Sequence, residues 1–185
     1  MFSRLKKINK NQKGFTLIEL IMVIAITALI IGVIVMSISL LLNVSARSDN
    51  HMLAVRQVQN AGYWISRDVQ MTQQEPVIVN DGGQLESITL AWQEFGTTDA
   101  NDATLHEVTY TLLVNGDLKR SHSVNGGDPT ETLVAQYIES GETSCVWDDD
   151  ADKLVLTVTA SVGTWPKVEN ETRVYEVIPR PDSVS

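Results

Sequence analysis

The first third of the chain contains one long apolar run. No charged side chain occurs from residue 20 to residue 46, and the stretch from Leu20 to Leu42 is almost entirely Leu, Ile, Val, Met and Ala. A helix needs roughly 20 apolar residues to cross the hydrocarbon layer of a bilayer. The run therefore predicts a membrane-spanning helix near the N-terminus.

Beyond Leu42 the sequence turns polar, but a stripe with spacings of three and four residues continues. Such a stripe predicts an amphipathic helix with one face on a core; its members are Val44, Ser48, His51, Val55, Val58, Gly62, Ile65 and Val69. Charged and polar residues that fall outside it include Arg47, Arg56, Gln57, Arg67 and Asp68. Since Pro76 is the first strong stop, we expect one helix from Phe15 to about Gln74.

Two residues of this stripe allow more than one interpretation. Gly62 indicates a kink or a close strand contact, or it is simply a tolerated glycine, which is the simpler interpretation. His51 has no second histidine near it in sequence, because His106 and His122 lie in separate segments. A packed or half-exposed histidine therefore explains His51 better than a metal ligand.

From Val77 onward the apolar period changes to two, which is typical of strands. The alternating or short apolar runs are Leu85–Trp92, Val108–Val114, Thr132–Ile138, Leu154–Ala160 and Arg173–Ile178. Of these, Thr132–Ile138 is either a short strand or a turn of helix. Asn115-Gly116 supplies a two-residue hairpin signal. We predict an α+β fold in which the long helix packs against a mainly antiparallel sheet.

These patterns divide the chain into five parts. We expect a basic leader over 1–14, a membrane-spanning half-helix over 15–43 and an amphipathic half-helix over 44–74. A β-rich domain then covers 75–178, and a loose tail covers 179–185.

Charge is distributed unevenly between these parts. The leader carries five basic side chains, and no acidic residue precedes Glu19. Residues 15–185 hold nine basic and all 23 acidic side chains, a formal charge of −14. Such a domain repels nucleic acid and anionic lipid head groups, so we expect no nucleic-acid partner. The basic leader before the span predicts a cytoplasmic N-terminus.

Glu19 is the exception in the apolar segment. A carboxylate costs about 2.5–3.5 kcal/mol at the bilayer centre and less near its edge. An acid in this position marks either a functional site or an interfacial, solvated side chain. A conventional secretory signal does not explain the segment, because its apolar run is too long and the best small-residue break, at Gly14, comes before it.

The stretch Lys13-Gly14-Phe15-Thr16-Leu17-Ile18-Glu19-Leu20, with the basic leader and the apolar helix, resembles the class III signal of type IV prepilins and type II secretion pseudopilins. The resemblance implies cleavage after Gly14 by a prepilin peptidase and N-methylation of Phe15. It also implies that Glu19 pairs with the Phe15 amine of a neighbouring subunit during filament assembly. The protein would sit in the inner membrane with its C-terminal domain periplasmic or extracellular, and then in a filament.

A finer resemblance concerns the kind of subunit. The segments Trp64–Gln70, Val108–Tyr110, Leu118–Arg120, Leu133–Ala135 and Tyr175–Arg180 are similar to J-type minor pseudopilins. Many major pilins carry a proline partway along the helix, whereas this chain has none before Pro76. The resemblance implies a minor pseudopilin at the tip of a pseudopilus, with other pseudopilins, the inner-membrane assembly platform and secreted proteins as partners. The alternative is a minor pilin of a type IV pilus or competence system.

No catalytic motif accompanies these signals. The sequence contains no HExxH, no nucleophile motif and no Gly-rich phosphate loop, so we expect no enzyme. A membrane-anchored enzyme or binding domain is the remaining alternative. We expect no cofactor, although an acidic group gives a calcium hypothesis; it consists of Asp148, Asp149, Asp150 and Asp152. A solvated Asp-rich hairpin turn explains this group more simply. The lone Cys145 predicts a buried thiol.

Overall fold

The computed structural model describes residues 14–73, 75–81, 83–95, 103–165 and 167–179. The predicted leader, except Gly14, and most of the predicted tail therefore lie outside the described residues. The chain forms two compact units, residues 1–45 and residues 46–185. The first unit is built around the apolar part of α1 (Leu17–Val69), and the second contains the rest of that helix and all the strands.

Helix α1 ends at Val69, before the exit that the sequence predicts near Gln74. Its last turn tightens, because the amides of Met71 and Thr72 donate to the carbonyls of Asp68 and Val69 at 3.1 Å. The Thr72 hydroxyl then donates to the Ala91 carbonyl at 2.8 Å. The chain thus leaves the helix because Thr72 is tied to a strand. Gln74 itself lies outside the described residues.

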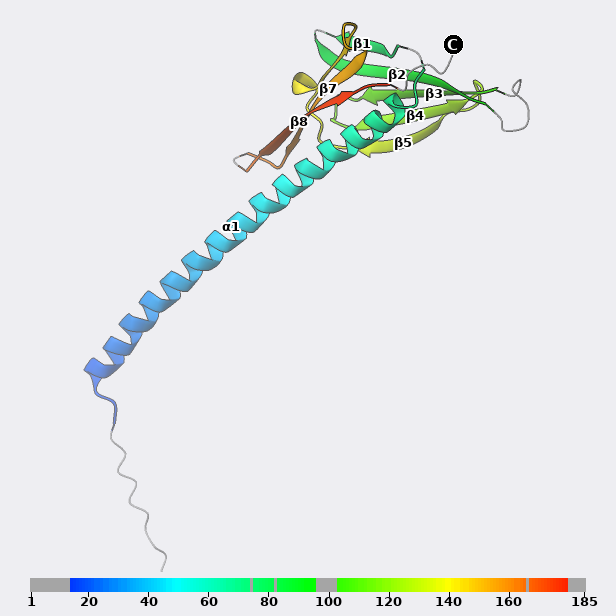
Figure 1. Ribbon diagram of the computed structural model, residues 1–185. Coiled ribbons are helices and arrows are strands. Elements are labelled where there is room, and N and C mark those ends of the chain that lie inside the picture. Colours follow the sequence, from blue (N-terminus) through cyan, green and yellow to red (C-terminus); the bar gives the residue numbers. More distant parts are fainter. Residues whose placement is uncertain (1–13, 74, 82, 96–102, 166, 180–185) are drawn as a thin grey trace, which may run out of the picture. The chain divides into compact units, whose positions relative to one another are not determined.

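The strands form two antiparallel sheets rather than the single sheet expected (Figure 1). The first sheet has the order β1-β2-β3-β4-β5; its strands are β1 (Val77–Asp81), β2 (Gln84–Phe95), β3 (Ala103–Leu112), β4 (Leu118–Val124) and β5 (Thr130–Ala135). The second has the order β6-β7-β8; its strands are β6 (Ser144–Asp148), β7 (Lys153–Val162) and β8 (Glu169–Val177). Within each sheet, sequential strands pair, as short connections favour.

The segment between β5 and β6 joins the two sheets. The amide of Glu139 donates to the Thr159 carbonyl at 2.9 Å, and the amide of Ser161 donates to the Tyr137 carbonyl at 2.8 Å. A one-turn 3-10 helix, η1 (Ser140–Glu142), follows. The amide of Leu85 then donates to the Thr143 carbonyl at 3.1 Å, so β2 is also tied to this connection.

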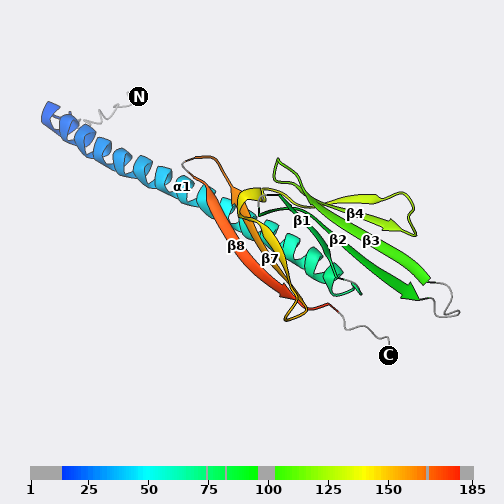
Figure 2. The same ribbon diagram turned by 90° about the horizontal axis from the view of Figure 1, so that it is seen from above.

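A single apolar core lies between the second part of α1 and both sheets. Figure 2 shows β7 and β8 beside this part of the helix. The buried face of the helix consists of Ala54, Val58, Ala61, Gly62, Ile65, Asp68 and Val69. The predicted stripe is thus confirmed from Val58 onward, whereas Val44, Ser48 and His51 are exposed. The predicted place of Asp68 outside the stripe is wrong, because it is buried at 2 % exposure.

The strand patterns explain the rest of the core. Ile88, Leu90 and Trp92 alternate on the buried side of β2, as predicted. Val108, Tyr110 and Leu112 do the same on β3, and a further set does so on β7; that set is Leu154, Leu156, Val158 and Ala160. These observations confirm the predicted α+β fold of a long helix packed on antiparallel sheets.

Candidate functional site

The predicted cleavage junction lies just outside the helix. Gly14, Phe15 and Thr16 are exposed and have no regular secondary structure, and α1 begins at Leu17. Apart from its two neighbours in the chain, no residue has an atom within 4 Å of the position that a Cβ on Gly14 would occupy. The Gly14–Phe15 bond therefore lies outside the helix.

Glu19 lies in the first turn of α1. Thr16 precedes the helix, and its Oγ1 accepts from the Glu19 amide at 3.4 Å. The spacing Thr16-x-x-Glu19 is that of a capping box, a local signal that the sequence reasoning missed. A carboxylate in the first turn also interacts favourably with the positive end of the helix dipole. These two effects lower the free-energy cost of placing the Glu19 carboxylate near the edge of a membrane. Neither of them supplies a cation to pair with it.

The surface of the first unit is apolar over its whole described helix. Every described residue from 14 to 45 is exposed, and among the described residues one helix is long and apolar enough to cross a membrane. Two of its hydroxyls bond within the helix: Thr27 donates to the Val23 carbonyl, and Ser37 donates to the Val33 carbonyl at 2.8 Å. The helix therefore presents no unsatisfied hydroxyl at these positions to lipid or to a similar helix.

In the second unit, Asp68 forms a buried junction between the helix and the first sheet. Its Oδ2 accepts from the Tyr110 hydroxyl on β3 at 2.5 Å and from Arg120 Nε on β4 at 2.7 Å. Burial raises the pKa of Tyr110 well above its usual value, and the bond to Asp68 adds to this. Burial alone would lower the pKa of Arg120, but the bond to Asp68 and its charge raise it overall. The group is thus a neutral phenol bound to an ion pair.

Trp64 covers this ion pair. The guanidinium carbons of Arg67 and Arg120 each lie 5.4 Å from its ring centroid. Such contacts contribute about 0.5–2 kcal/mol each, depending on solvent access. The segment Trp64–Asp68 of α1 therefore contacts Arg120 on β4 in two ways. Asp68 forms the ion pair, and the Trp64 ring makes a cation–π contact.

Gly62 makes the close strand contact that the sequence allowed as one interpretation. A Cβ at this position would lie 2.1 Å from Cζ of Tyr175 on β8. The Tyr175 hydroxyl donates to the Val58 carbonyl at 3.1 Å. The glycine is needed because the ring rests directly on the helix backbone.

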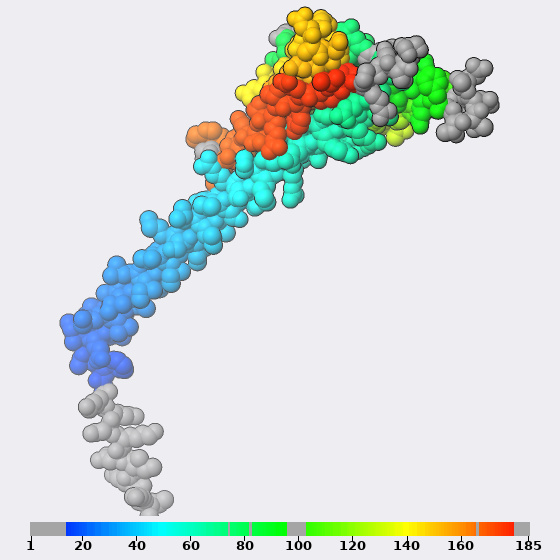
Figure 3. All heavy atoms as spheres, in the orientation of Figure 1, coloured from blue at the N-terminus to red at the C-terminus, as the bar shows by residue number. Residues whose placement is uncertain are grey.

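A second contact with β8 involves the first helical turns of this unit. Arg47 is paired with Glu169, and Asn50 Nδ2 donates to the Lys167 carbonyl at 3.1 Å. Figure 3 shows the orange and red atoms of β7 and β8 against the helix here. These two contacts hold the turn between β7 and β8 against the part of α1 that begins the second unit.

The sequence did not indicate a relation between His106 and His122, but the structure brings them together. His106 Nδ1 lies 3.0 Å from His122 Nε2, and Trp92 stacks on His106 with ring centroids 5.3 Å apart. Burial, together with the charge of Arg120, lowers the pKa of His122 and favours its neutral form. His106 Nε2 lies 3.4 Å from the Glu94 carboxylate, but without hydrogen-bond geometry, so this contact is at most ionic.

The acidic group that gave the calcium hypothesis lies in the turn between β6 and β7. Asp148 Oδ1 accepts from the amides of Asp150 and Ala151 at 3.2 and 3.3 Å, and Asp152 has a positive φ of 46°. Over the described part of the chain, which includes Asp149, no three or more His, Cys, Asp or Glu side chains are grouped so as to hold a metal ion. The Asp148 carboxylate thus stabilises the turn that follows it by accepting hydrogen bonds from the backbone of that turn.

Cys145 lies in the core on β6, as its sequence context predicts. Burial raises the pKa of its thiol to about 12. The thiol is therefore neutral and shielded, which makes it a packing group rather than a nucleophile.

Comparison with known proteins yields one match. A family model described as the prokaryotic N-terminal methylation motif matches residues 9–42. No curated protein and no solved structure matches the chain. The match covers the junction, Glu19 and the apolar helix. The chain therefore carries the N-terminal signal of the prepilin class on a pilin-like fold.

Proposed function

We propose that this pilin-like chain is a minor pseudopilin, a structural subunit of a type II secretion pseudopilus that acts at its tip or in its initiation. The observation that carries the proposal is the methylation motif over residues 9–42, which continues into a helix packed on antiparallel sheets. This combination supplies a removable membrane anchor and a folded domain on one chain.

The proposed cycle begins in the inner membrane. A prepilin peptidase cleaves after Gly14, and the new Phe15 amine is N-methylated and keeps its charge. The exposed apolar helix is stored in lipid until assembly. In the filament, Glu19 pairs with the Phe15 amine of a neighbouring subunit, because a carboxylate among apolar helices requires an opposite charge.

The junction around Asp68 supports the minor pseudopilin assignment. Three segments that resemble J-type subunits, Trp64–Gln70, Val108–Tyr110 and Leu118–Arg120, meet at this ion pair. The structure thus gives these three segments one shared structural role. The uninterrupted α1, without a proline, also fits a minor rather than a major subunit.

Deletion of the gene in its host tests the assignment. We expect secretion of type II substrates to stop while pilus-dependent twitching and DNA uptake persist, with full rescue by the wild-type gene. The opposite pattern would assign the chain to the alternative, a minor pilin of a pilus or competence system. A Glu19→Ala gene is the matched control, since its product has the same domain but lacks the assembly contact.

A further inference from the structure

One end of the first sheet brings together two imidazoles, an indole and a carboxylate. Trp92 on β2 pairs with His106 on β3, which in turn pairs with Val124 at the end of β4. Side chains two residues apart on a strand share a face, so Glu94 and His122 lie on the same face as this row. Strand pairing thus places these four groups side by side across three strands.

Each ring nitrogen of His106 faces a different group. Its Nδ1 lies 3.0 Å from His122 Nε2. Its Nε2 is buried, has no hydrogen-bond partner among the described residues, and lies 3.4 Å from a carboxylate oxygen of Glu94. A buried polar atom without a partner is unfavourable and rare in folded proteins. Because the Glu94 side chain is 72 % exposed, it has room to turn and accept a hydrogen bond from Nε2.

The distance between the two imidazoles limits the number of protons that they hold. At 3.0 Å, one of the facing nitrogens donates and the other accepts. A charge on both rings would make the facing nitrogens of His106 and His122 both N–H donors, which would break this bond and place two cations in contact. The pair is therefore stable when it is neutral or when it carries one positive charge.

The charges around His122 disfavour a cation on that ring. Burial lowers its pKa, and the positive charges of Arg120 and of the other imidazole lower it further. Asp68 on α1 acts in the opposite direction, but its carboxylate is already paired with Arg120 at 2.7 Å. On β5 the residue paired with His122 is the uncharged Thr130. A single positive charge is thus better placed on the imidazole of β3, which has the carboxylate of β2 beside it.

We propose that His106 is a proton-operated clasp at this end of the first sheet. When its ring takes up a proton from solvent, Nδ1–H donates to His122 Nε2 and Nε2–H donates to the Glu94 carboxylate. One side chain on β3 then binds both β2 and β4. When the proton returns to solvent, only one ring nitrogen of His106 keeps an N–H, and only one of the two bonds remains. This inference concerns contacts within the folded domain and does not rest on the proposed function.

Nitrogen NMR of the full chain in detergent micelles, with ¹⁵N-labelled histidine, identifies the ring that takes up the proton. The chain contains three histidines, and the exposed His51 on α1 serves as an internal reference. As the pH falls from 8 to 5, we expect His106 to become charged while His122 stays neutral with its proton on Nδ1. Charging of His122 before His106 would overturn the proposal.

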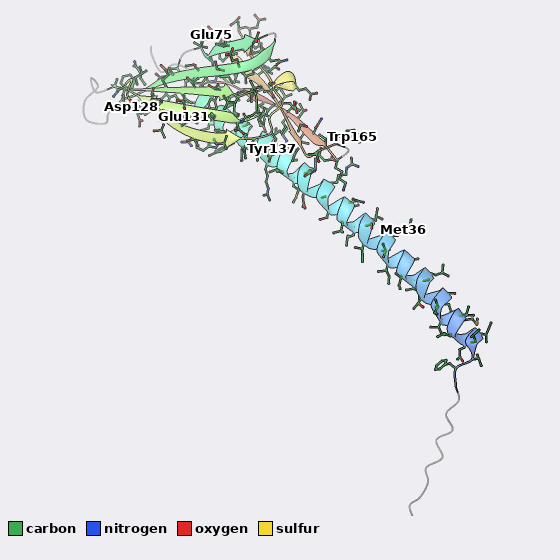
Figure 4. All side chains as sticks on the ribbon, turned by 180° about the vertical axis from the view of Figure 1, so that it is seen from behind. Met36, Glu75, Asp128, Glu131, Tyr137 and Trp165 are labelled. Carbon is green, nitrogen blue, oxygen red and sulfur yellow. The ribbon has the colours of Figure 1, made fainter. Side chains whose placement is uncertain are left out.

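Glu94→Gln removes the charge of the carboxylate and keeps its size. We expect the midpoint of the His106 titration to move down by about 0.5–1 pH unit, because a facing carboxylate favours the charged ring. Asp128→Asn is the matched control, since it removes an exposed acid from the turn between β4 and β5 (Figure 4). An equal shift in both variants would show that the general charge of the domain acts, and not the clasp.

Urea unfolding of the same chains at pH 5 and pH 8 tests whether the clasp holds the fold. Glu94→Gln should lower the equilibrium constant for folding at pH 5 by about two- to fivefold, the range of an exposed ion pair. It should leave that constant unchanged at pH 8, where His106 carries no charge to pair. A loss of equal size at both pH values, or no loss at pH 5, would contradict the proposal, since a merely structural role of Glu94 does not depend on a proton.

Discussion

The ring of Tyr175 lies on Gly62 of α1 so closely that a Cβ there would come within 2.1 Å of Cζ. Its hydroxyl donates to the Val58 carbonyl at 3.1 Å. Tyr175 on β8, the edge strand of the second sheet, therefore contacts the helix backbone directly. A larger residue at Gly62 would displace the ring, so the glycine allows β8 to pack on the helix.

Gly62→Ala is expected to destabilise the domain despite the better helix propensity of alanine. Alanine favours a helix interior by about 1 kcal/mol over glycine, but overpacking costs about 1–3 kcal/mol. Urea unfolding of the full chain in detergent measures the net change. The double variant Gly62→Ala/Tyr175→Ala removes the clash, so the effect of Gly62→Ala should become neutral or stabilising in that background. A loss of stability as large in the Tyr175→Ala background as in the wild-type background would contradict the contact.

Asp68→Ala should be strongly destabilising, because it leaves Arg120 and Tyr110 buried without their acceptor. Breaking a buried pair by removing one partner costs about 3–5 kcal/mol. Glu131→Ala is the matched control on the neighbouring strand, since the exposed Lys119–Glu131 pair at 3.2 Å is expected to contribute only about 0–1 kcal/mol. Denaturant titration compares the two variants, and similar losses would show that the buried junction contributes little.

Stability should fall with pH above about 9, and Cys145 should contribute to the fall. Its folded pKa is raised to about 12 from 9.0, so the folded state holds a proton that the unfolded state loses as pH rises. One such proton contributes a slope of about 1.4 kcal/mol per pH unit. Unfolding free energies from pH 9 to pH 10 measure it, and Cys145→Ala should flatten the curve. Above pH 10 the raised pKa of Tyr110 adds a further loss.

The mature protein should begin at methylated Phe15. Intact-mass measurement of the membrane-extracted chain checks both the loss of residues 1–14 and the added methyl group. Gly14 is exposed and outside the helix, so the bond is accessible. A start at Met1 in a host with active prepilin peptidase would refute the processing site.

Glu19→Gln should be processed normally but enter filaments poorly. Gln keeps the polar side chain of the capping box, so it separates charge pairing from helix capping. Thr16→Ala, which removes the Thr16 Oγ1 acceptor, is the converse control and should leave incorporation largely intact. Sheared-filament immunoblots quantify both variants. Normal incorporation of Glu19→Gln would mean that the acid is only interfacial.

The sequence by itself determined the features that are written in contiguous residues. The apolar run and the acid Glu19 within it were recognisable, because hydropathy depends on near neighbours. The capping box of Thr16 and Glu19 is equally local, although it was missed. Strand alternation was also readable, since side chains on a strand face opposite sides at every step.

Only the tertiary structure decided which distant residues meet. Asp68 appeared to be a surface residue until Tyr110 and Arg120 supplied its hydrogen bonds, and the need for Gly62 depends on a tyrosine 113 positions later. The His106–His122 contact likewise follows from strand pairing that no local pattern encodes. A polar residue on a helix has the same local signal whether water or a sheet faces it, so its burial is set by packing alone.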